Sequence, residues 1–463
     1  MDTDPPAYSR TLILALVTVA TFLNPFTGSA VNLALPTIGQ EFVVDAATLA
    51  WISSAYLLSS VLFLLPAGRL GDSRGRISVF KIGTVVYAAA SLLTMFTPSI
   101  ASLLALRFVQ GIGGAMIYAN SVAIITQLYP PGERGYAIGM NVTAVYAGLS
   151  LGPFLGGVLT HFFGWRSIFL VSVLLAVPVL GYFRKFPAFL DEKREEQFDI
   201  PGVALSSLVL FFFFIGLTSA ASPTGILLLA VAVLLGIVFY SVEKKQDSPL
   251  FPVTLLEKNR VFAFSNLAAL INYSATFAVA FLLSLYLQYV RGYDPAAAGS
   301  LLLIQPIVQV CISPLAGRLS DRVSAVHVAS AGLAVSAVSL FGFSLLSPET
   351  PVAVIVSLLI VLGAGLALFS SPNTNAIMSS VESRHYGSAS AMVATMRALG
   401  MLVSMGMVMV VFTVSMGTTA ITPPVYHLFL ESMEIVFGIF FVLTLLGIVF
   451  SLVRRGVRTT QPP

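Results

Sequence analysis

The sequence predicts an all-α membrane protein with 14 transmembrane helices, arranged as two six-helix bundles plus two inserted central helices. Hydrophobic residues make up 57% of the 463-residue chain and charged residues only 10%, whereas soluble domains carry about 25% charged residues. The apolar runs are long enough to cross a bilayer as helices. In addition, a charged motif recurs in the two halves of the chain.

Each predicted span is an apolar run bounded by Gly, Pro or charged residues. A helix needs about 20 residues to cross roughly 30 Å of hydrocarbon. Helices satisfy their own backbone hydrogen bonds in lipid, whereas a barrel would show short alternating segments. In chain order the predicted spans are 11–36, 47–67, 77–97, 100–127, 135–160, 165–183, 201–220, 224–242, 261–289, 295–317, 325–346, 351–378, 387–414 and 429–453.

Positive charge predicts the orientation. The acidic N-terminal stretch lacks the basic start of a cleavable signal peptide, so we expect it to be retained. If it is cytoplasmic, 20 of the 24 Lys and Arg residues fall in cytoplasmic segments, Arg166 and Arg291 fall outside, and Arg107 and Arg397 fall within spans. This bias predicts a multi-pass protein of the plasma (inner) membrane with both termini cytoplasmic. It also explains the net charge of +4 without a nucleic-acid partner.

Three pairs of positions recur at offsets of 249 to 252 residues: Asp72 and Asp321, Gly111 and Gly363, Gly148 and Gly400. These matches indicate duplication of a six-helix unit, with two helices left over between the copies. The predicted organisation is an N-terminal six-helix bundle (1–183), a charged cytoplasmic linker (184–200), two inserted helices (201–242), a second cytoplasmic linker (243–260), a C-terminal six-helix bundle (261–453) and a cytoplasmic tail (454–463).

Four motifs carry a family resemblance. They are GRLGDSRGR from Gly68, LLALRFVQGIGGA from Leu103, GLSLGPFLGG from Gly148 and GWRSIF from Gly164. Over nearly its whole length the chain resembles the major facilitator superfamily, and its helix number resembles the fourteen-helix drug:proton antiporter family. The resemblance implies a secondary transporter in which two halves rock about a midplane cavity.

The charged loop and its echo form a candidate gate. Glycines permit a tight turn, and an aspartate can accept hydrogen bonds from a neighbouring helix or from arginine, which would latch one helix arrangement. The alternative is a positive-inside anchor without a switching role. The candidate gating residues are Gly68, Arg69, Asp72, Gly75, Arg76, Gly317, Arg318, Asp321 and Arg322.

Glycines also mark the fifth span. Glycines at four-residue spacing make a flat face for close helix packing, and a proline can kink the helix. The resemblance adds a hinge or proton-leak barrier, as an antiporter-type motif. The residues are Gly148, Gly152, Pro153, Gly156 and Gly157.

Polar and aromatic residues inside the spans predict a substrate cavity. A charge at the membrane centre is costly, so both intramembrane arginines should face a cavity or a partner. Interhelical hydrogen bonding is the alternative for each residue. Together the amides and aromatics suit a bulky amphipathic molecule. The candidates are Asn24, Thr27, Asn32, Arg107, Tyr118, Asn141, Tyr146, Asn266, Tyr273, Phe277, Gln305, Gln309, Asn373, Arg397 and Met401.

The acids depart from the family pattern. Thr27 stands where the resembling antiporters usually have an aspartate, and no predicted span has a carboxylate near its midplane. Because an intramembrane carboxylate is the usual proton carrier, this weakens the coupling that the resemblance implies. The remaining candidates for a proton carrier are Asp72, Glu431 and Glu434.

The sequence contains neither a phosphate-binding loop nor an HExxH motif, and its one cysteine, Cys311, excludes a cysteine cluster. We therefore expect no enzyme activity, no cofactor and no metal. The predicted function is secondary transport by a monomer, most simply multidrug or amphipathic-compound efflux with proton antiport. The expected partners are a small-molecule substrate, the lipid bilayer and protons as counter-ion. The alternatives are a narrow-specificity metabolite exporter, an uncoupled facilitator, or a non-transporting membrane scaffold or sensor.

Overall fold

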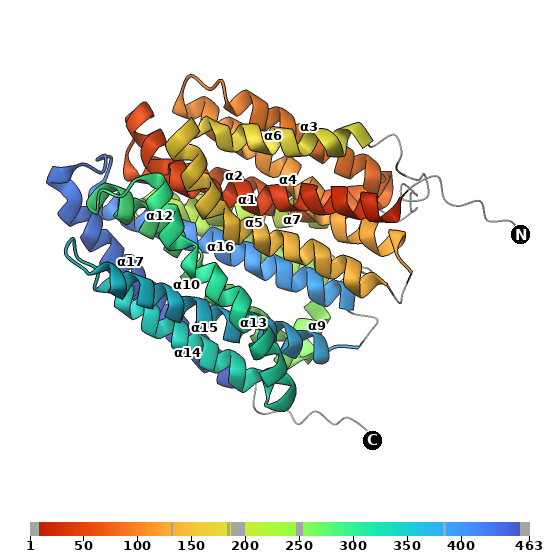
Figure 1. The fold of residues 1–463 in the computed structure, drawn as a ribbon. Helices are drawn as coiled ribbons and strands as arrows, with labels where there is room; N and C mark the ends of the chain where they lie inside the picture. Colours follow the sequence, from red (N-terminus) through yellow and green to blue (C-terminus); the bar gives the residue numbers. More distant parts are fainter. Residues whose placement is uncertain are drawn as a thin grey trace, which may run out of the picture. The chain divides into compact units, whose positions relative to one another are not determined.

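A computed structural model describes residues 9–130, 133–182, 186, 200–246, 253–382 and 386–453 of the chain. These residues are helical apart from short turns and connections, and they contain no strand (Figure 1). The all-α prediction is confirmed.

The helices of the first half follow the predicted spans closely. They are α1 (Arg10–Phe42), α2 (Ala46–Arg74), α3 (Arg76–Thr94), α4 (Ile100–Leu128), α5 (Arg134–Phe163), α6 (Arg166–Tyr182), α7 (Ile200–Thr218) and α8 (Pro223–Glu243). Side-chain caps set several of the starts. Ser9, Ser99 and Ser222 accept hydrogen bonds from the first-turn amides of α1, α4 and α8, which are donors that the helix itself leaves free.

The second half is more interrupted. Its elements are α9 (Val253–Lys258), α10 (Arg260–Thr276), α11 (Val279–Leu285), the π-helical turn η3 (Tyr286–Val290), α12 (Pro295–Leu302), α13 (Ile304–Arg322), α14 (Ala325–Ser344), α15 (Val352–Ser379), α16 (Tyr386–Met416), the 3-10 turn η5 (Pro423–Val425) and α17 (Tyr426–Val453).

Two spans predicted as single helices are broken. The span 261–289 divides into α10, α11 and η3, and the amide of Ala278 donates to Ser404 Oγ of α16 at 3.1 Å. The span 295–317 divides into α12 and α13 at Leu303, because Pro306 has no N–H to donate to the Leu302 carbonyl.

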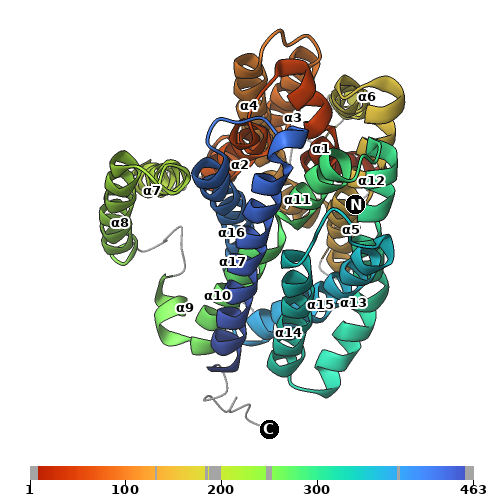
Figure 2. The ribbon, with the colours of Figure 1, turned by 90° about the vertical axis from the view of Figure 1, so that its left-hand side faces the viewer.

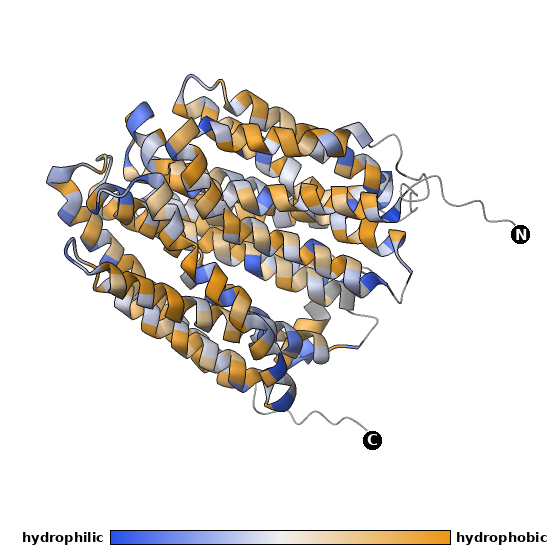
Figure 3. Ribbon diagram, viewed as in Figure 1, coloured by the Kyte–Doolittle hydropathy of each residue, from blue (hydrophilic) through white to orange (hydrophobic). Residues whose placement is uncertain are grey.

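In the described part of the chain, 13 helical segments are long and apolar enough to cross a membrane. Helix α6 is also apolar but shorter than these segments. Hydrophobic residues dominate the helices, and many hydrophilic residues lie at helix ends and in connections (Figure 3). The fold therefore has 13 or 14 apolar helices, and the full fourteen-helix arrangement stays a prediction.

The helices cluster into two compact units. Unit 1 comprises residues 1–44, 51–211 and 293–300, and unit 2 comprises residues 45–50, 212–292 and 301–463. The predicted domain boundaries remain an expectation. The tail 454–463 and nearly all of the linker 184–200 lie outside the described residues.

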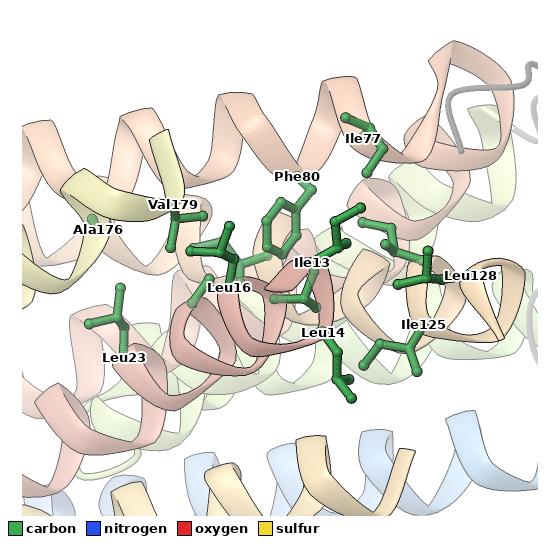
Figure 4. Close-up of a cluster of buried hydrophobic side chains, with 14 of the residues drawn as sticks. Ile13, Leu14, Leu16, Leu23, Ile77, Phe80, Ile125, Leu128, Ala176 and Val179 are labelled. Carbon is green, nitrogen blue, oxygen red and sulfur yellow. The ribbon is translucent and has the colours of Figure 1, made fainter. Parts of the chain in front are cut away.

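A tight apolar core holds unit 1 together. Side chains of α1, α3, α4 and α6 converge there, with Ile13, Phe80 and Leu128 among them (Figure 4). Ile13 and Phe80 are completely buried. In a membrane the association of helices depends on such close packing, because lipid is as apolar as these side chains.

Unit 2 has its own core, to which α10, α14, α15 and α16 contribute Phe262, Leu333, Phe369 and Met392 among others. Within unit 2 the end of α7 lies beside α8 (Figure 2), and a Cβ on Gly216 of α7 would lie 2.8 Å from the Leu229 amide nitrogen of α8. At their turn the backbone of Gly225 approaches Ser219 so closely that a Cβ would lie 1.9 Å from the Ser219 carbonyl oxygen. Much of α8 is exposed, including Leu227, Val233 and Leu234, as expected of a lipid-facing helix.

Candidate functional site

Unit 1 encloses a charged side chain within its membrane-crossing helices. Arg107 of α4 is completely buried. Its Nε donates to the Ile52 carbonyl at 3.2 Å, its Nη1 donates to Gln110 Oε1 at 2.6 Å, and its guanidinium lies 4.3 Å from the centre of the Tyr56 ring. Gln110 in turn donates to Ser91 Oγ at 2.7 Å. Arg107 is therefore held by neutral groups of α2, α3 and α4.

A second chain of neutral hydrogen bonds includes the position where the resembling antiporters have an acid. Thr27 Oγ1 lies 2.8 Å from Ser172 Oγ of α6, and the Tyr87 hydroxyl of α3 donates to Thr27 Oγ1 at 2.8 Å. The Tyr56 hydroxyl donates to the Asn24 carbonyl at 3.1 Å. The side chains in these hydrogen bonds are alcohols and phenols, so this group of residues carries no fixed charge.

Several other candidates of unit 1 lie in helix packing. Asn32 is buried and its Oδ1 accepts from Ser53 at 2.8 Å, and Asn141 Nδ2 is 3.5 Å from Ser121 Oγ. Tyr118 and Tyr146 are partly exposed. Interhelical bonding, the alternative that the sequence left open, describes the two asparagines, and a substrate contact by any of the four remains a prediction.

Unit 2 has its own arginine on an aromatic face. The Arg397 guanidinium lies 5.3 Å from the centre of the Tyr273 ring. Gly400 brings α16 close to α10, because a Cβ there would lie 2.7 Å from both the Leu270 carbonyl oxygen and Tyr273 Cβ. Arg397 and Met401 are partly buried.

The amide candidates of unit 2 are mostly engaged. Asn373 Nδ2 donates to the Ser265 carbonyl, Asn266 Nδ2 donates to the Phe262 carbonyl of its own helix, and Gln305 Nε2 donates to Gln309 Oε1. Phe277 and the two glutamines are partly buried. Of these residues, Phe277 lies at the break between α10 and α11.

The charged loop of the first half forms a tight corner between α2 and α3. Asp72 and Arg76 form an ion pair at 2.8 Å. Gly75, between the two helices, has a φ of +104°, a value that residues with a Cβ rarely adopt. Behind the loop Gly71 touches Asn120 of α4, where a Cβ would lie 1.8 Å from Oδ1. Gly68 and Arg69 lie in the same last turns of α2.

The echo of this loop lies at the end of α13. Gly317, Arg318, Asp321 and Arg322 all belong to that helix, but the side chain of Asp321 lies outside what the structure describes. Asn375 of α15 donates to Ser320 Oγ at 3.3 Å, much as Asn120 donates to the Ala67 carbonyl at 3.2 Å. An asparagine thus donates a hydrogen bond beside each of the two loops.

The glycines of α5 form a close contact with α1. A Cβ at Gly148, Gly152 or Gly156 would approach α1 atoms to between 1.8 and 2.9 Å. Ser29 of α1 donates to the Gly148 carbonyl at 3.1 Å across this contact. Gly157 lies against Pro295 of the same unit. A Cβ on Gly157 would lie 2.2 Å from the Pro295 carbonyl oxygen. The close packing predicted from the glycine spacing is present.

The acids lie at the margins. Glu431 and Glu434 near the start of α17 are exposed. Among the described residues, Glu243 is the only acidic side chain that is buried, with 1% exposure at the last position of α8. The sequence reasoning did not consider Glu243, because it read this position as the start of a cytoplasmic linker.

Comparison with known proteins agrees with this architecture. A family model described as Major Facilitator Superfamily matches residues 17–405 and, in a second match, 266–463. The chain belongs to the major facilitator superfamily. Members are transporters, so this chain is a multi-pass membrane transporter of small molecules.

Named relatives within the superfamily differ in what their names say they carry. The riboflavin transporter RibZ of Clostridioides difficile is 29% identical, over 84% of this chain and 85% of the relative. The multidrug resistance protein Stp of Mycobacterium tuberculosis is 30% identical, over 85% and 74%. The multidrug efflux pump LfrA of Mycolicibacterium smegmatis is 28% identical, over 88% and 83%.

Solved structures of the superfamily share the fold. A bacterial homologue of the lysosomal transporter Spinster matches with a TM-score of 0.69 at 14% identity, over 98% of both chains. The nucleoside transporter NupG matches with a TM-score of 0.64 at 12% identity, over 96% of this chain and all of that one.

Proposed function

We propose that this superfamily member exports amphipathic, drug-like compounds by secondary active transport through alternating access, with the two repeated six-helix bundles as the moving parts. The buried polar interior of unit 1 carries the proposal, because it combines one arginine, aromatic faces and neutral hydroxyls within helices that otherwise face lipid. Such surfaces hold a large, mostly apolar molecule and orient it by a few polar contacts. Relatives named for multidrug resistance and efflux support the choice of substrate class.

Arg107, Tyr118 and Tyr146 in unit 1, with Arg397 and Met401 in unit 2, contact the substrate. The loop of Asp72 and Arg76 latches one conformation. Both termini face the cytoplasm, as the distribution of Lys and Arg predicts.

Proton antiport is the coupling that the superfamily resemblance suggests, with Asp72, Glu431 and Glu434 as candidate carriers. A second candidate function is uncoupled, facilitated export. The observation that favours it is Thr27, which takes part in a neutral hydrogen-bonded chain where a proton-driven exchanger needs a titratable group.

Proteoliposomes with the purified protein test the proposal. A panel of amphipathic dyes and a riboflavin control are measured with and without an imposed pH gradient. Saturable, protein-dependent flux of several unrelated dyes supports multidrug export, and acceleration by the gradient supports antiport. Flux of the dyes that is indifferent to the gradient selects the uncoupled exporter. Flux of riboflavin alone would replace the multidrug proposal with a narrow-specificity transporter.

A further inference from the structure

The positively charged Arg107 has no negatively charged partner among the described residues. Its Nε and Nη1 are hydrogen bonded to uncharged oxygens, while Nη2 is buried without a hydrogen-bond partner among the described residues. Burying an unpaired guanidinium in a membrane-crossing helix costs several kcal/mol. An ionisable residue within a membrane-crossing helix is therefore a candidate contact for a substrate or an ion.

The acids in the described membrane-crossing helices of unit 1 pair with residues other than Arg107. Two acids belong to the described membrane-crossing helices of this unit, Glu41 in α1 and Asp72 in α2. Glu41 accepts from both Arg166 and Trp165, and Asp72 pairs with Arg76. Arg107 therefore has no hydrogen bond or ion pair with any described carboxylate.

Neighbouring groups fix the direction of the unused donor. The Ile52 carbonyl and Gln110 hold two of the three nitrogens, and the Tyr56 ring covers one face of the guanidinium. Gly111 and Gly114 let α4 approach so closely that added Cβ atoms would lie 2.0 Å from Ser59 Oγ and 2.3 Å from Asn24 Oδ1. Nη2 is the guanidinium nitrogen without a hydrogen bond to the described residues, and a planar guanidinium held in this way suits an oxyanion.

We propose that Arg107 recognises the anionic group of the substrate through Nη2, so that the transporter prefers amphipathic organic anions, with a carboxylate, sulfonate or phosphate on an apolar body. The inference rests on the proposed export function and narrows its substrate class. Because the guanidinium is enclosed in this structure, the anion reaches Nη2 only after the side chains over it move. A cation at the same place meets an uncompensated positive charge and is rejected.

Two dyes with a common xanthene core provide the test: carboxyfluorescein, which is anionic at neutral pH, and rhodamine 123, which is cationic. Counterflow of each dye is measured in proteoliposomes containing wild type, Arg107→Gln, Arg107→Lys or the control Arg134→Gln. Arg134 is a matched control because it also donates to a backbone carbonyl, that of Tyr129, but stands at the first position of α5.

Wild type should prefer carboxyfluorescein. Arg107→Gln should lower kcat/KM for carboxyfluorescein roughly 10- to 100-fold, the loss expected for one charged hydrogen bond, and should leave rhodamine 123 flux unchanged or higher. Arg107→Lys should retain part of the preference, and Arg134→Gln all of it.

Binding to wild type gives a readout that needs no variant. Carboxyfluorescein should raise the melting temperature of the purified protein and rhodamine 123 should not. An equal loss of both fluxes in Arg107→Gln with a lower melting temperature would make Arg107 structural and overturn the inference. A wild-type preference for rhodamine 123 would overturn the inference and leave the export function standing. Absence of flux for both dyes would count against both proposals.

Discussion

Gly156 of α5 lies against the backbone of Ala30 in α1, so that a Cβ on Gly156 would come within 2.6 Å of both the Cα and the carbonyl oxygen of Ala30. Backbone atoms cannot turn aside as a side chain can. Gly156→Ala must therefore separate the two helices, and we expect a loss of about 1–3 kcal/mol in the free energy of unfolding, read as a lower melting temperature in detergent.

Gly139 of the same helix is the matched control, because nothing lies within 4 Å of its added Cβ. Gly139→Ala should be neutral or stabilising by about 0.5–1 kcal/mol. Equal melting temperatures for the two variants would contradict the close contact between α1 and α5.

Thr27→Val keeps the shape of Thr27 but removes the oxygen that joins Tyr87 to Ser172. Because the site is fully buried, water cannot replace the lost bonds, and we expect a cost of about 0.6–2 kcal/mol. Thr27→Ser keeps the hydroxyl and should melt close to wild type. Thermal unfolding of both variants measures the difference, and a Val variant as stable as the Ser variant would count against the hydrogen-bonded chain.

Glu257 of α9 accepts hydrogen bonds from Tyr240 and from Lys244 next to the end of α8. These bonds, that from Tyr240 first, hold the pKa of Glu257 below its usual value, and the bond to Glu257 raises the pKa of Lys244. The lowered pKa means that Glu257 stabilises this contact above about pH 4.5 and loses that effect as pH falls through its lowered pKa. Lys244 contributes below about pH 10.5 and loses its contribution above its raised pKa.

Hydrogen exchange of α9 in detergent checks this pH window. At neutral pH, Glu257→Gln should exchange faster in α9 than wild type. The two proteins should converge in acid, where the wild-type carboxyl is protonated. A difference that persists undiminished at low pH would show that the charge of Glu257 is not what holds α9.

Asp72→Asn tests the latch. The pair with Arg76 is partly exposed, with side-chain exposures of 29% and 15%, so its loss should cost stability only about 0.3–1 kcal/mol. If the loop latches a conformation, dye flux should fall several-fold while dye binding stays near wild type. Glu133→Gln, an exposed acid at the start of α5, is the control. Unchanged flux in Asp72→Asn would reduce the loop to a topological anchor.

Hydropathy and charge were sufficient to predict the helical class and nearly all helix positions, because both follow from the cost of exposing polar groups to lipid. They also identified Arg107 as a residue that needs a partner. They could not identify the Tyr56 ring beside Arg107, or Tyr87 and Ser172 as the partners of Thr27. The contacts of Thr27 join residues 60 and 145 positions apart and depend on how the helices pack.

The two helix breaks in the second half have different causes, one local in the sequence and one that depends on a tertiary contact. Pro306 gave a local signal for the division between α12 and α13. The division at Phe277 and Ala278 had none, because neither residue is Gly or Pro and the Ala278 amide bonds to Ser404, 126 positions away. Glu243 was missed for a different reason: a carboxylate beside two lysines reads as solvent-exposed in sequence.

The bond from Ala278 to Ser404 gives the interrupted span of unit 2 two independent attachments. The segment after the break is fastened to α16 by this bond and by Phe281, whose ring centre lies 6.4 Å from that of Phe412, whereas α10 ends one residue before Phe277. Because α10 also packs against α16 at Gly400, where a Cβ would lie 2.7 Å from the Leu270 carbonyl oxygen, the same helix anchors the span before and after its interruption.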